Sequence, residues 1–272
     1  MKRFIAGVSA EEYPPEQAKF RAPLLLVHGV WSGAWCWQSW ATHFCNLGWD
    51  SFAIDLRRRS TQNPSENLYR LGFGDCVQDL ANVIRSFPTP PVLLAMNLGA
   101  AMALKASASS KPAALILVSP SPPGNLTEAR SQRQRLLWLK YRLLILLHRP
   151  VQIDEKDFRA YFLTPLPKTL ENALSHQTVP ESSALVREFL LPRVNLEPGP
   201  LGYPTLVLGG SDDRITPAVT TKRVAAFLGA EFREYAGQGH WLIERDGENI
   251  VRDIHRWIIQ KLGEKILLAE FS

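Results

Sequence analysis

The sequence LLLVHGVWSGAW (residues 24–35) joins a short apolar run to a turn that contains two glycines. A short apolar run that ends at a turn is typical of a strand buried on both faces of a parallel sheet. Three further runs have the same character, and patterns with apolar residues three and four positions apart, typical of helices, separate them. This alternation predicts an α/β fold. The predicted strands are Leu24–His28, Phe52–Asp55, Val92–Met96 and Leu115–Val118, and the predicted helices are Gly33–Leu47, Phe73–Phe87 and Leu98–Ser109.

The alternation of strands and helices is interrupted in the middle of the chain. After SPSPPG (residues 119–124), residues 126–196 carry helical patterns broken by prolines and no convincing strand. We therefore predict a mostly parallel, twisted sheet flanked by helices, formed by residues 1–121 and 200–272, with residues 122–199 inserted as a helical cap. The elements predicted after the cap are the strand Pro204–Leu208, the helix Pro217–Leu228, the strand Glu231–Tyr235 and the helix Glu248–Leu262.

The composition is that of an ordinary globular chain. Its 272 residues are 46% hydrophobic and 21% charged, which excludes a disordered or collagen-like protein. The cysteines, Cys36, Cys45 and Cys76, are odd in number and widely spaced, so they predict neither a disulfide framework nor a zinc site. With no leader core and no membrane-spanning apolar run visible, we expect a soluble, cytoplasmic protein. The net charge of +5 comes from 31 basic and 26 acidic residues, without a nucleic-acid-binding motif.

Two loops in the second half carry an acid and a histidine. GGSDDRITP (residues 209–217) follows one predicted strand, and AGQGHW (residues 236–241) follows the next. Because the loops at the carboxyl ends of parallel strands line one crevice, we expect Asp213 and His240 to form a spatial pair. A carboxylate beside an imidazole orients it and stabilises its charged form, which suits His240 to proton transfer. The alternative is that Asp212 and Asp213 form the turn or cap the helix that opens at Pro217, a role that can belong to one of them alone.

The strand with its His-Gly loop, the acid turn and the Gly-His loop together resemble the α/β-hydrolase superfamily, from about Pro23 to Leu262. VWSGAWCW (residues 30–37) is similar to the loops of small-molecule esterases and hydroxynitrile lyases. The resemblance implies a His240–Asp213 dyad and implies neither a cofactor nor a metal. It also implies an oxyanion hole and a substrate pocket. The oxyanion hole would be formed by the backbone amides of Leu98 and of Val30 or Trp31, and the pocket would include His28, Gly29, Met96 and Trp241.

Asn97 stands at the position of the superfamily's nucleophile. The superfamily pattern Gly-x-Ser-x-Gly aligns with AMNLG (residues 95–99), whose middle residue is asparagine. A carboxamide has no hydroxyl or thiol for His240 to deprotonate, and its nitrogen lone pair is delocalised, so an acyl-enzyme on Asn97 is chemically implausible. Asparagine tolerates the positive φ that this strand-to-helix turn demands, which predicts that the turn itself is kept.

Three explanations of Asn97 remain open. In the first, the chain is an enzyme that acts without a covalent acyl-enzyme on a small, largely apolar carbonyl- or ester-containing molecule, as a lyase, cyclase, isomerase or water-activating hydrolase. In the second, it is a catalytically inactive relative that binds a ligand. In the third, Asn97 is a trap substitution in an ordinary hydrolase whose nucleophile was Ser or Asp. A relocated nucleophile at Ser32, Ser119 or Ser121 is not favoured, because none of them lies on a strand-to-helix elbow.

Two basic clusters lie outside these motifs. QRLLWLKYRLLILLH (residues 134–148) places apolar residues on most of two faces of a cap helix, and Arg135, Lys140 and Arg142 on another. Such a helix packs on the core or lies at a membrane surface, and the sequence allows a weak contact of the second kind. Arg57–Arg59 is interpreted as a solvated loop or as a collar for an anionic substrate. The expected partner is a small-molecule substrate or ligand and not nucleic acid, and the sequence does not determine the oligomeric state.

Overall fold

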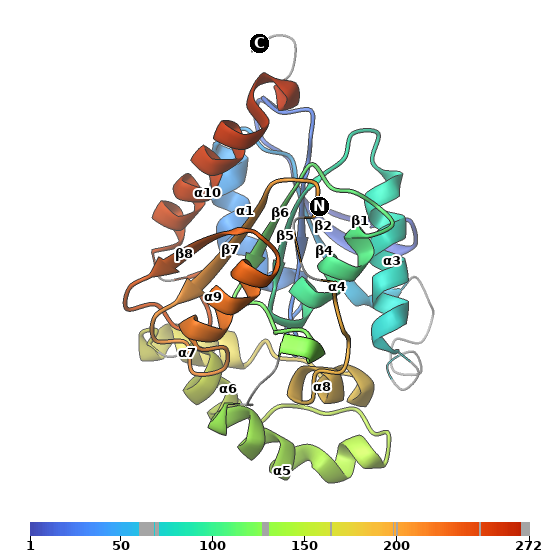
Figure 1. The fold of residues 1–272 in the computed structure, drawn as a ribbon, viewed down its shortest axis with the longest axis vertical. Coiled ribbons are helices and arrows are strands. Elements are labelled where there is room, and N and C mark those ends of the chain that lie inside the picture. The colour runs from blue at the N-terminus through green and yellow to red at the C-terminus, as the bar shows by residue number, and fades with distance from the viewer. Residues whose placement is uncertain are drawn as a thin grey trace.

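The computed structural model describes residues 1–59, 68, 71–126, 131–163, 165–197, 199, 201–244 and 246–267, with the backbone alone for residues 57–59 and 264. Within these residues an eight-stranded sheet forms the centre of the molecule, in the order β1-β2-β4-β3-β5-β6-β7-β8 (Figure 1). The strands are β1 (Lys2–Ile5), β2 (Val8–Tyr13), β3 (Leu24–Val27), β4 (Ser51–Arg59), β5 (Val92–Met96), β6 (Ala114–Val118), β7 (Thr205–Gly210) and β8 (Glu231–Tyr235).

Most of the sheet is parallel, and its centre is fully buried. β1 and β2 form an antiparallel hairpin, β2 pairs antiparallel with β4, and the remaining pairs are parallel. β3, β5 and β6 are buried along their whole length, as near-continuous runs of Leu, Val and Ile require. In the register, Val27 pairs with Ala95 and Met96 pairs with Val118. The segments that leave β3, β5 and β6 therefore start side by side at one edge of the sheet.

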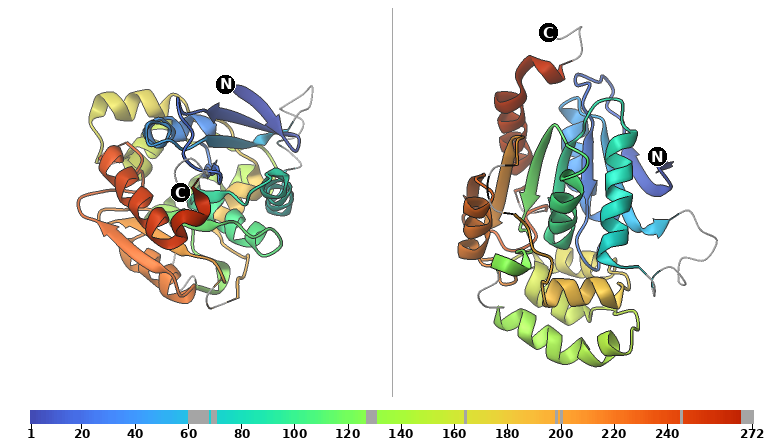
Figure 2. Two further views of the ribbon diagram at one scale, coloured as in Figure 1. Left: turned by 90° about the horizontal axis from the view of Figure 1, so that it is seen from above. Right: turned by 45° about the vertical axis from the view of Figure 1, so that its right-hand side comes forward.

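Helices cover both faces of this sheet (Figures 1 and 2). α1 (Gln38–Asn46) and α10 (Gly247–Leu262) pack together on one face, and α3 (Phe73–Ser86) and α4 (Asn97–Ser107) on the other. α9 (Ala218–Phe227) packs on β7 and β8. α4 is buried on nearly all sides, which its run of glycine, alanine and other small residues permits.

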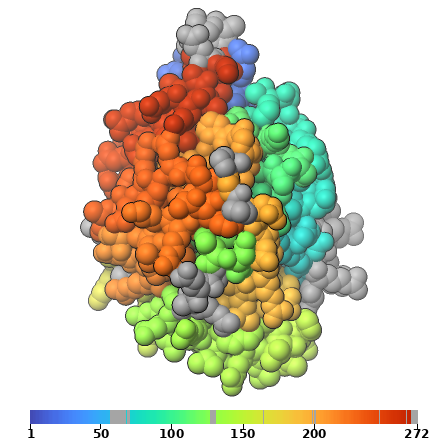
Figure 3. All heavy atoms as spheres, in the orientation of Figure 1, coloured from blue at the N-terminus to red at the C-terminus, as the bar shows by residue number. Residues whose placement is uncertain are grey.

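A group of helices inserted between β6 and β7 covers the carboxyl ends of the strands (Figure 1). It consists of α5 (Gln132–Leu146), α6 (Glu155–Phe158), α7 (Lys168–Ser175) and α8 (Ser183–Leu190), and we call these helices with their connections the cap. A π-helical turn, Arg159–Leu163, follows α6 directly. α5 packs against α8 and forms the end of the molecule farthest from α10 (Figures 1 and 3).

The predicted α/β architecture with an inserted set of helices is confirmed, and most predicted strands and helices end within two residues of the observed bounds. The division at residues 121/122 and 199/200 into core and cap stays a prediction. One omission concerns β1 and β2, which lie at the edge of the sheet. β1 is exposed at three of its four residues, so it carries too little hydrophobic alternation to be recognised.

Two further expectations were wrong. Gly33–Leu47 is not one helix, because a 3₁₀ turn, Ala34–Trp37, precedes α1, as is frequent at helix N-termini. Arg57–Arg59 is not a loop. The backbone continues β4 through Arg59, which pairs with Val8, because the β1–β2 hairpin provides a neighbouring strand along that stretch. The side chains of these arginines lie outside the described residues.

Gly99 sets how closely α4 approaches the end of β3. A Cβ atom at Gly99 would lie 2.2 Å from the carbonyl oxygen of His28 and 3.1 Å from that of Val27. Both are backbone atoms and cannot rotate away. Only glycine therefore allows the first turn of α4 to pack against the loop that follows β3.

We expect Gly99→Ala to destabilise the protein by about 1–3 kcal/mol or more, because an overpacked methyl group must displace backbone. Gly74 is the matched control, because it is also helical and its Cβ would meet no atom within 4 Å. Gly74→Ala is expected to stabilise α3 by about 0.5–1 kcal/mol. Equilibrium urea unfolding of both variants measures the difference, and equal effects would contradict the close approach.

Candidate active site

Asn97 lies at the sharp turn between β5 and α4. It is the first residue of α4 and has a φ of 53°, in the left-handed region that few residues other than glycine adopt. A Cβ atom at Gly29 would lie 2.6 Å from the Asn97 Cβ, so the loop after β3 approaches the turn closely because Gly29 has no side chain. The predicted preservation of the strand-to-helix turn is thus found in the structure.

The carboxamide of Asn97 is bonded at both ends. Its Oδ1 accepts hydrogen bonds from the backbone N–H of Leu98 at 2.7 Å and, more weakly, from that of Val30 at 3.5 Å. Its Nδ2 lies 2.8 Å from Nε2 of His240. Two of the three amides predicted for an oxyanion hole therefore converge on one point, and the side-chain oxygen of Asn97 occupies that point.

His240 and Asp213 form a buried pair. Nδ1 of His240 lies 2.8 Å from Oδ2 of Asp213, and neither side chain has accessible surface. The other carboxylate oxygen of Asp213 accepts the backbone N–H groups of Ile215 and Thr216, each at 2.8 Å. Asp212 is exposed and its carboxylate accepts a bond from Ser211 instead. The structure thus brings Asp213, and not Asp212, to the imidazole.

The contacts of Asn97 also assign the donor and acceptor roles of the two ring nitrogens of His240. The N–H of Leu98 requires an acceptor, so Oδ1 of Asn97 faces Leu98 and Nδ2 faces the imidazole. Because Nδ2 only donates, Nε2 of His240 must present its lone pair. The ring proton then lies on Nδ1, where it is donated to Asp213. This neutral tautomer is the form in which a histidine acts as a general base.

Trp31 ties the loop after β3 to the cap, and its backbone amide is directed to the cap as well. Its backbone N–H is directed to Oε2 of Glu181 at 3.4 Å, and its indole N–H donates to the carbonyl of Val151 at 2.9 Å. Its own carbonyl accepts the N–H of Val179 at 3.2 Å. Trp31 holds a φ of 58°, which turns its amide away from Asn97 toward the cap. Of the two amides, that of Val30 is directed to Oδ1 of Asn97 and that of Trp31 to Glu181, and the oxyanion-hole role itself stays a prediction.

Aromatic side chains of the cap cover the imidazole. The ring of Phe162 meets that of His240 edge to face, with centroids 5.3 Å apart. Trp31 in turn packs edge to face against Phe162 and Phe189, at 5.8 and 5.7 Å. Asn97 and His240 keep only 2% and 1% of their surface accessible. The cap is thus closed over these residues.

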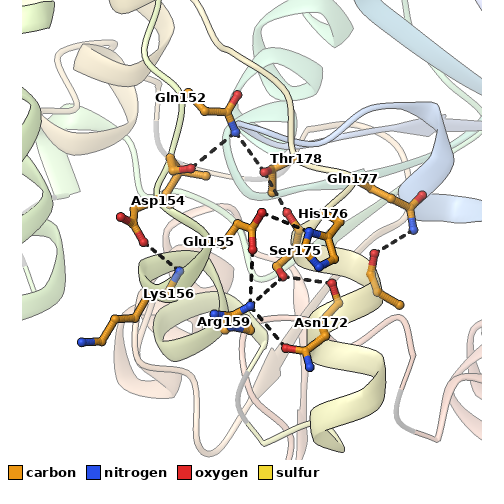
Figure 4. A network of polar contacts seen from close by, with 12 residues as sticks. Gln152, Asp154, Glu155, Lys156, Arg159, Asn172, Ser175, His176, Gln177 and Thr178 are labelled. Carbon is orange, nitrogen blue, oxygen red and sulfur yellow. Dashed lines mark hydrogen bonds and ion pairs between the residues drawn. The ribbon is translucent and has the colours of Figure 1, made fainter.

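Polar contacts within the cap hold the segment that carries Phe162 (Figure 4). Nη1 of Arg159 lies 3.5 Å from a carboxylate oxygen of Glu155, 3.2 Å from Oδ1 of Asn172 and 3.3 Å from Oγ of Ser175. Nδ1 of His176 lies 3.0 Å from the other oxygen of Glu155. These contacts join α6 and the π-helical turn to α7, and they fix the backbone from which the Phe162 ring projects toward His240.

The predicted pocket residues divide between a small cavity and the core. His28 and Gly29 lie at a cavity of about 10 Å³, roughly the room that one water molecule needs. Met96 is buried against Cys36, with the two sulfur atoms 3.9 Å apart, and Trp241 stacks on Trp35. The cavity is lined by His28, Gly29, Val30, Leu56, Cys76, Leu98, Gly99, Met102, Glu181 and Leu185. Apart from His28 and Glu181, its side chains are apolar.

None of the three serines considered as a relocated nucleophile is hydrogen-bonded to His240 within the described part of the chain. Ser32 donates its hydroxyl to the carbonyl of Gly29 at 3.1 Å. Ser119 and Ser121 are buried, and their hydroxyls have no partner among the described residues. The backbone N–H of Ser121 donates to the carbonyl of Asn97 at 3.0 Å. The Nε2 atom that would activate a serine faces Asn97 instead.

Two residues of the site were missed by the sequence analysis. Glu181 is a buried carboxylate of the cap that reaches Trp31, and Phe162 is the aromatic ring on His240. Both belong to the cap, in which no motif marks which side chains point toward the sheet. Across the described residues, no group of three or more His, Cys, Asp or Glu side chains could hold a metal ion.

The chain belongs to the alpha/beta hydrolase family, whose sequence profile matches residues 24–253. Solved structures show the same fold. An esterase from Exiguobacterium antarcticum superposes with a TM-score of 0.70 at 17% identity, covering 95% of this chain and 99% of that chain. A monoacylglycerol lipase from Paleococcus ferrophilus gives 0.68 at 17% identity, with 93% and 99% covered. A meta-cleavage product hydrolase from Pseudomonas fluorescens IP01 gives 0.69 at 12% identity, with 96% and 97% covered. No curated protein matches the chain at a significant level.

We expect Trp31→Phe to cost about 1 kcal/mol more than Trp37→Phe, because only the first change removes a hydrogen bond. Both tryptophans are fully buried, so both changes remove similar apolar area. The indole N–H of Trp31 donates to Val151, whereas that of Trp37 has no partner within the described residues. Urea unfolding of the two variants gives the comparison. Equal losses would mean that the indole bond to the cap contributes nothing to stability.

Proposed function

We propose that this chain is an enzyme that acts on a small, largely apolar carbonyl- or ester-containing molecule without forming a covalent acyl-enzyme. The observation that carries the proposal is one continuous chain of hydrogen bonds. It runs from Asp213 through His240 to Asn97 and ends at the backbone N–H of Leu98. This series of hydrogen bonds combines a neutral histidine base with two convergent backbone amides, and it contains no nucleophile.

Asn97 is proposed to position the substrate. Its carboxamide nitrogen has no free lone pair and meets His240 as a hydrogen-bond donor, so the imidazole has no proton to remove from a nucleophile there. A substrate oxygen that displaces Oδ1 would accept the N–H groups of Leu98 and Val30 in its place. The freed carboxamide could then donate a hydrogen bond to a second oxygen, of the substrate or of water.

His240 is proposed to move the proton. Once the Asn97 carboxamide is displaced, the Nε2 lone pair of His240 can accept a proton from water or from a carbon or hydroxyl of the substrate. The imidazolium that forms is stabilised by the buried Asp213 carboxylate. With the cap closed the adjacent cavity has room for about one water molecule, but its lining includes Leu98, Met102 and Leu185, so a site enlarged there would favour a largely apolar substrate. The proposed reaction classes are those of a lyase, cyclase, isomerase or water-activating hydrolase.

The second candidate is a protein of this family that binds a ligand without turnover. One observation favours it. Oδ1 of Asn97 fills the point where the Leu98 and Val30 amides converge, while Nδ2 faces the imidazole, so the carboxamide lies as a bound amide substrate would lie. In that case the Asn97 side chain itself occupies the place where a substrate would bind. The two candidates differ in whether removal of His240 changes any reaction.

We expect His240→Ala to lower kcat/KM by on the order of 100-fold or more, because general base catalysis typically contributes that much. Asn97→Ala is expected to have a smaller effect. Asp213→Asn is expected to lower kcat/KM as well, because Asp213 orients and stabilises the imidazole. Asp212→Asn is its matched control, since Asp212 is exposed and its carboxylate accepts from Ser211. The assay is steady-state turnover of small esters, cyanohydrins and enolisable ketones. Equal, small effects of His240→Ala and Asn97→Ala would favour the binding protein.

A fluorophosphonate probe tests the absence of a nucleophile directly, because it reacts with an activated serine. We expect no adduct on the native chain by intact-mass analysis, and one adduct per chain on the Asn97→Ser variant. Asn97→Ser combined with His240→Ala is the control and should lose the adduct. An adduct on the native chain would contradict the proposal, and peptide mapping would then test Ser32, Ser119 and Ser121. Strong hydrolytic turnover gained by Asn97→Ser or Asn97→Asp would favour the trap explanation.

A further inference from the structure

α5 exposes a continuous row of leucines. Five leucines point away from the protein with between 49% and 65% of their surface accessible, and we call them the leucine face. They follow one another at spacings of three, four, three and one residues, so they share one side of the helix. The leucine face consists of Leu136, Leu139, Leu143, Leu146 and Leu147.

The opposite side of α5 already accounts for how the helix is held in the cap. Leu137, Tyr141 and Ile145 are buried there, and α5 packs against α8 through this side. Gln134 is buried as well and donates to the backbone carbonyl of Phe189 at 3.4 Å. A helix that is apolar on both sides but covered on one side only has a second apolar surface, which the described residues leave uncovered.

Positive charge accompanies the leucine face. Arg135 and Arg142 are exposed beside it, one helical turn on either side of Leu139, and Arg149 follows the end of the helix. None of the three has an ion pair within the described part of the chain. Lys140 lies on the other flank, where Asp157 at 2.6 Å and Asp154 at 3.6 Å neutralise it. From Ala129 to Ile153 the sequence contains no Asp or Glu.

The position of α5 leaves the leucine face open to a large, flat partner. α5 forms one end of the molecule and lies across it, and the rest of the cap lies between α5 and the sheet (Figures 1 and 3). Figure 2 shows the same arrangement from another side. Among the described helices, none is both long enough and apolar enough to cross a membrane. α5 is therefore suited to a contact at the surface of a membrane and not to crossing it.

We propose that α5 binds the surface of an anionic lipid bilayer, with the leucine face inserted among the acyl chains and Arg135 and Arg142 at the headgroups. Charge complementarity carries this choice of partner, because cations near an anionic leaflet are attracted to it. A second copy of this chain fits less well. Pairing two leucine faces would bring the unpaired Arg135 and Arg142 side chains of one copy near those of the other, and the row spans too few heptads for a coiled coil.

Vesicle co-sedimentation of the full chain tests the proposal. The vesicles are phosphatidylcholine alone and an equimolar mixture of phosphatidylcholine and phosphatidylglycerol. We expect strong binding to the mixed vesicles, at least tenfold weaker binding to the neutral ones, and loss of binding as salt is raised. No binding, or equal binding to both kinds of vesicle, would overturn the proposal.

Two double variants separate the contributions of charge and of insertion. Leu139→Gln with Leu143→Gln, and Arg135→Gln with Arg142→Gln, should each weaken binding to the mixed vesicles at least tenfold. All four positions are exposed and glutamine favours helix, so thermal unfolding should be unchanged. The matched controls are Val219→Gln, an apolar residue 60% exposed on α9, and Lys111→Gln with Lys168→Gln, two exposed cations that are not on α5. Both controls should bind as the native chain does.

Two outcomes would assign the leucine face differently and so overturn the proposal. In the first, the leucine variant binds mixed vesicles as well as the native chain, which would reduce the contact to adsorption of charge. In the second, sedimentation equilibrium without lipid shows a dimer that Leu139→Gln with Leu143→Gln dissociates. The inference does not depend on the proposed reaction, because vesicle binding is measured without turnover.

Discussion

The hydrogen bond from the Leu98 amide to Oδ1 of Asn97 is the contact on which the geometry of the site depends. It decides which end of the carboxamide is oxygen, and thereby which atom faces His240. That in turn places the proton of the imidazole on Nδ1, toward Asp213. A serine at the same position would offer one polar atom in place of the separate donor and acceptor atoms of asparagine. Asparagine therefore links the two halves of the site that a serine leaves separate.

This arrangement requires strained backbone, and the surrounding packing keeps it in place. Asn97 and Trp31 both hold positive φ, a conformation that costs a residue other than glycine about 1–3 kcal/mol. Gly99 lets the start of α4 approach the His28 carbonyl, and Gly29 leaves room for the Asn97 side chain. Burial then strengthens every hydrogen bond along the chain from Asp213 to Leu98, because the local dielectric constant is low. The closed cap is thus part of what holds the carboxamide in one orientation.

The sequence was sufficient for the parts of the molecule that follow from local pattern. The apolar runs of β3, β5 and β6 identified a parallel sheet, and the loops after β7 and β8 identified Asp213 and His240 because such loops share one edge of a sheet. The edge hairpin β1–β2 was missed because an exposed strand has no strong pattern. Glu181 and Phe162 were missed because their positions depend on how the cap packs. The sequence could not show that the amide of Trp31 is directed to Glu181 and that of Val30 to Asn97, because both directions depend on the backbone of the loop.

α5 connects the outer surface of the cap to the residues above the site. Its buried side carries Tyr141, whose ring centroid lies 6.4 Å from that of Trp31, and its exposed side carries the leucine face. A partner shifts an equilibrium between closed and open cap only by the difference in its affinity for the two states. The leucine face is already complete while the cap is closed, so binding there requires no opening. The proposed membrane contact through α5 is therefore separable from access to His240, and mutations can change one without the other.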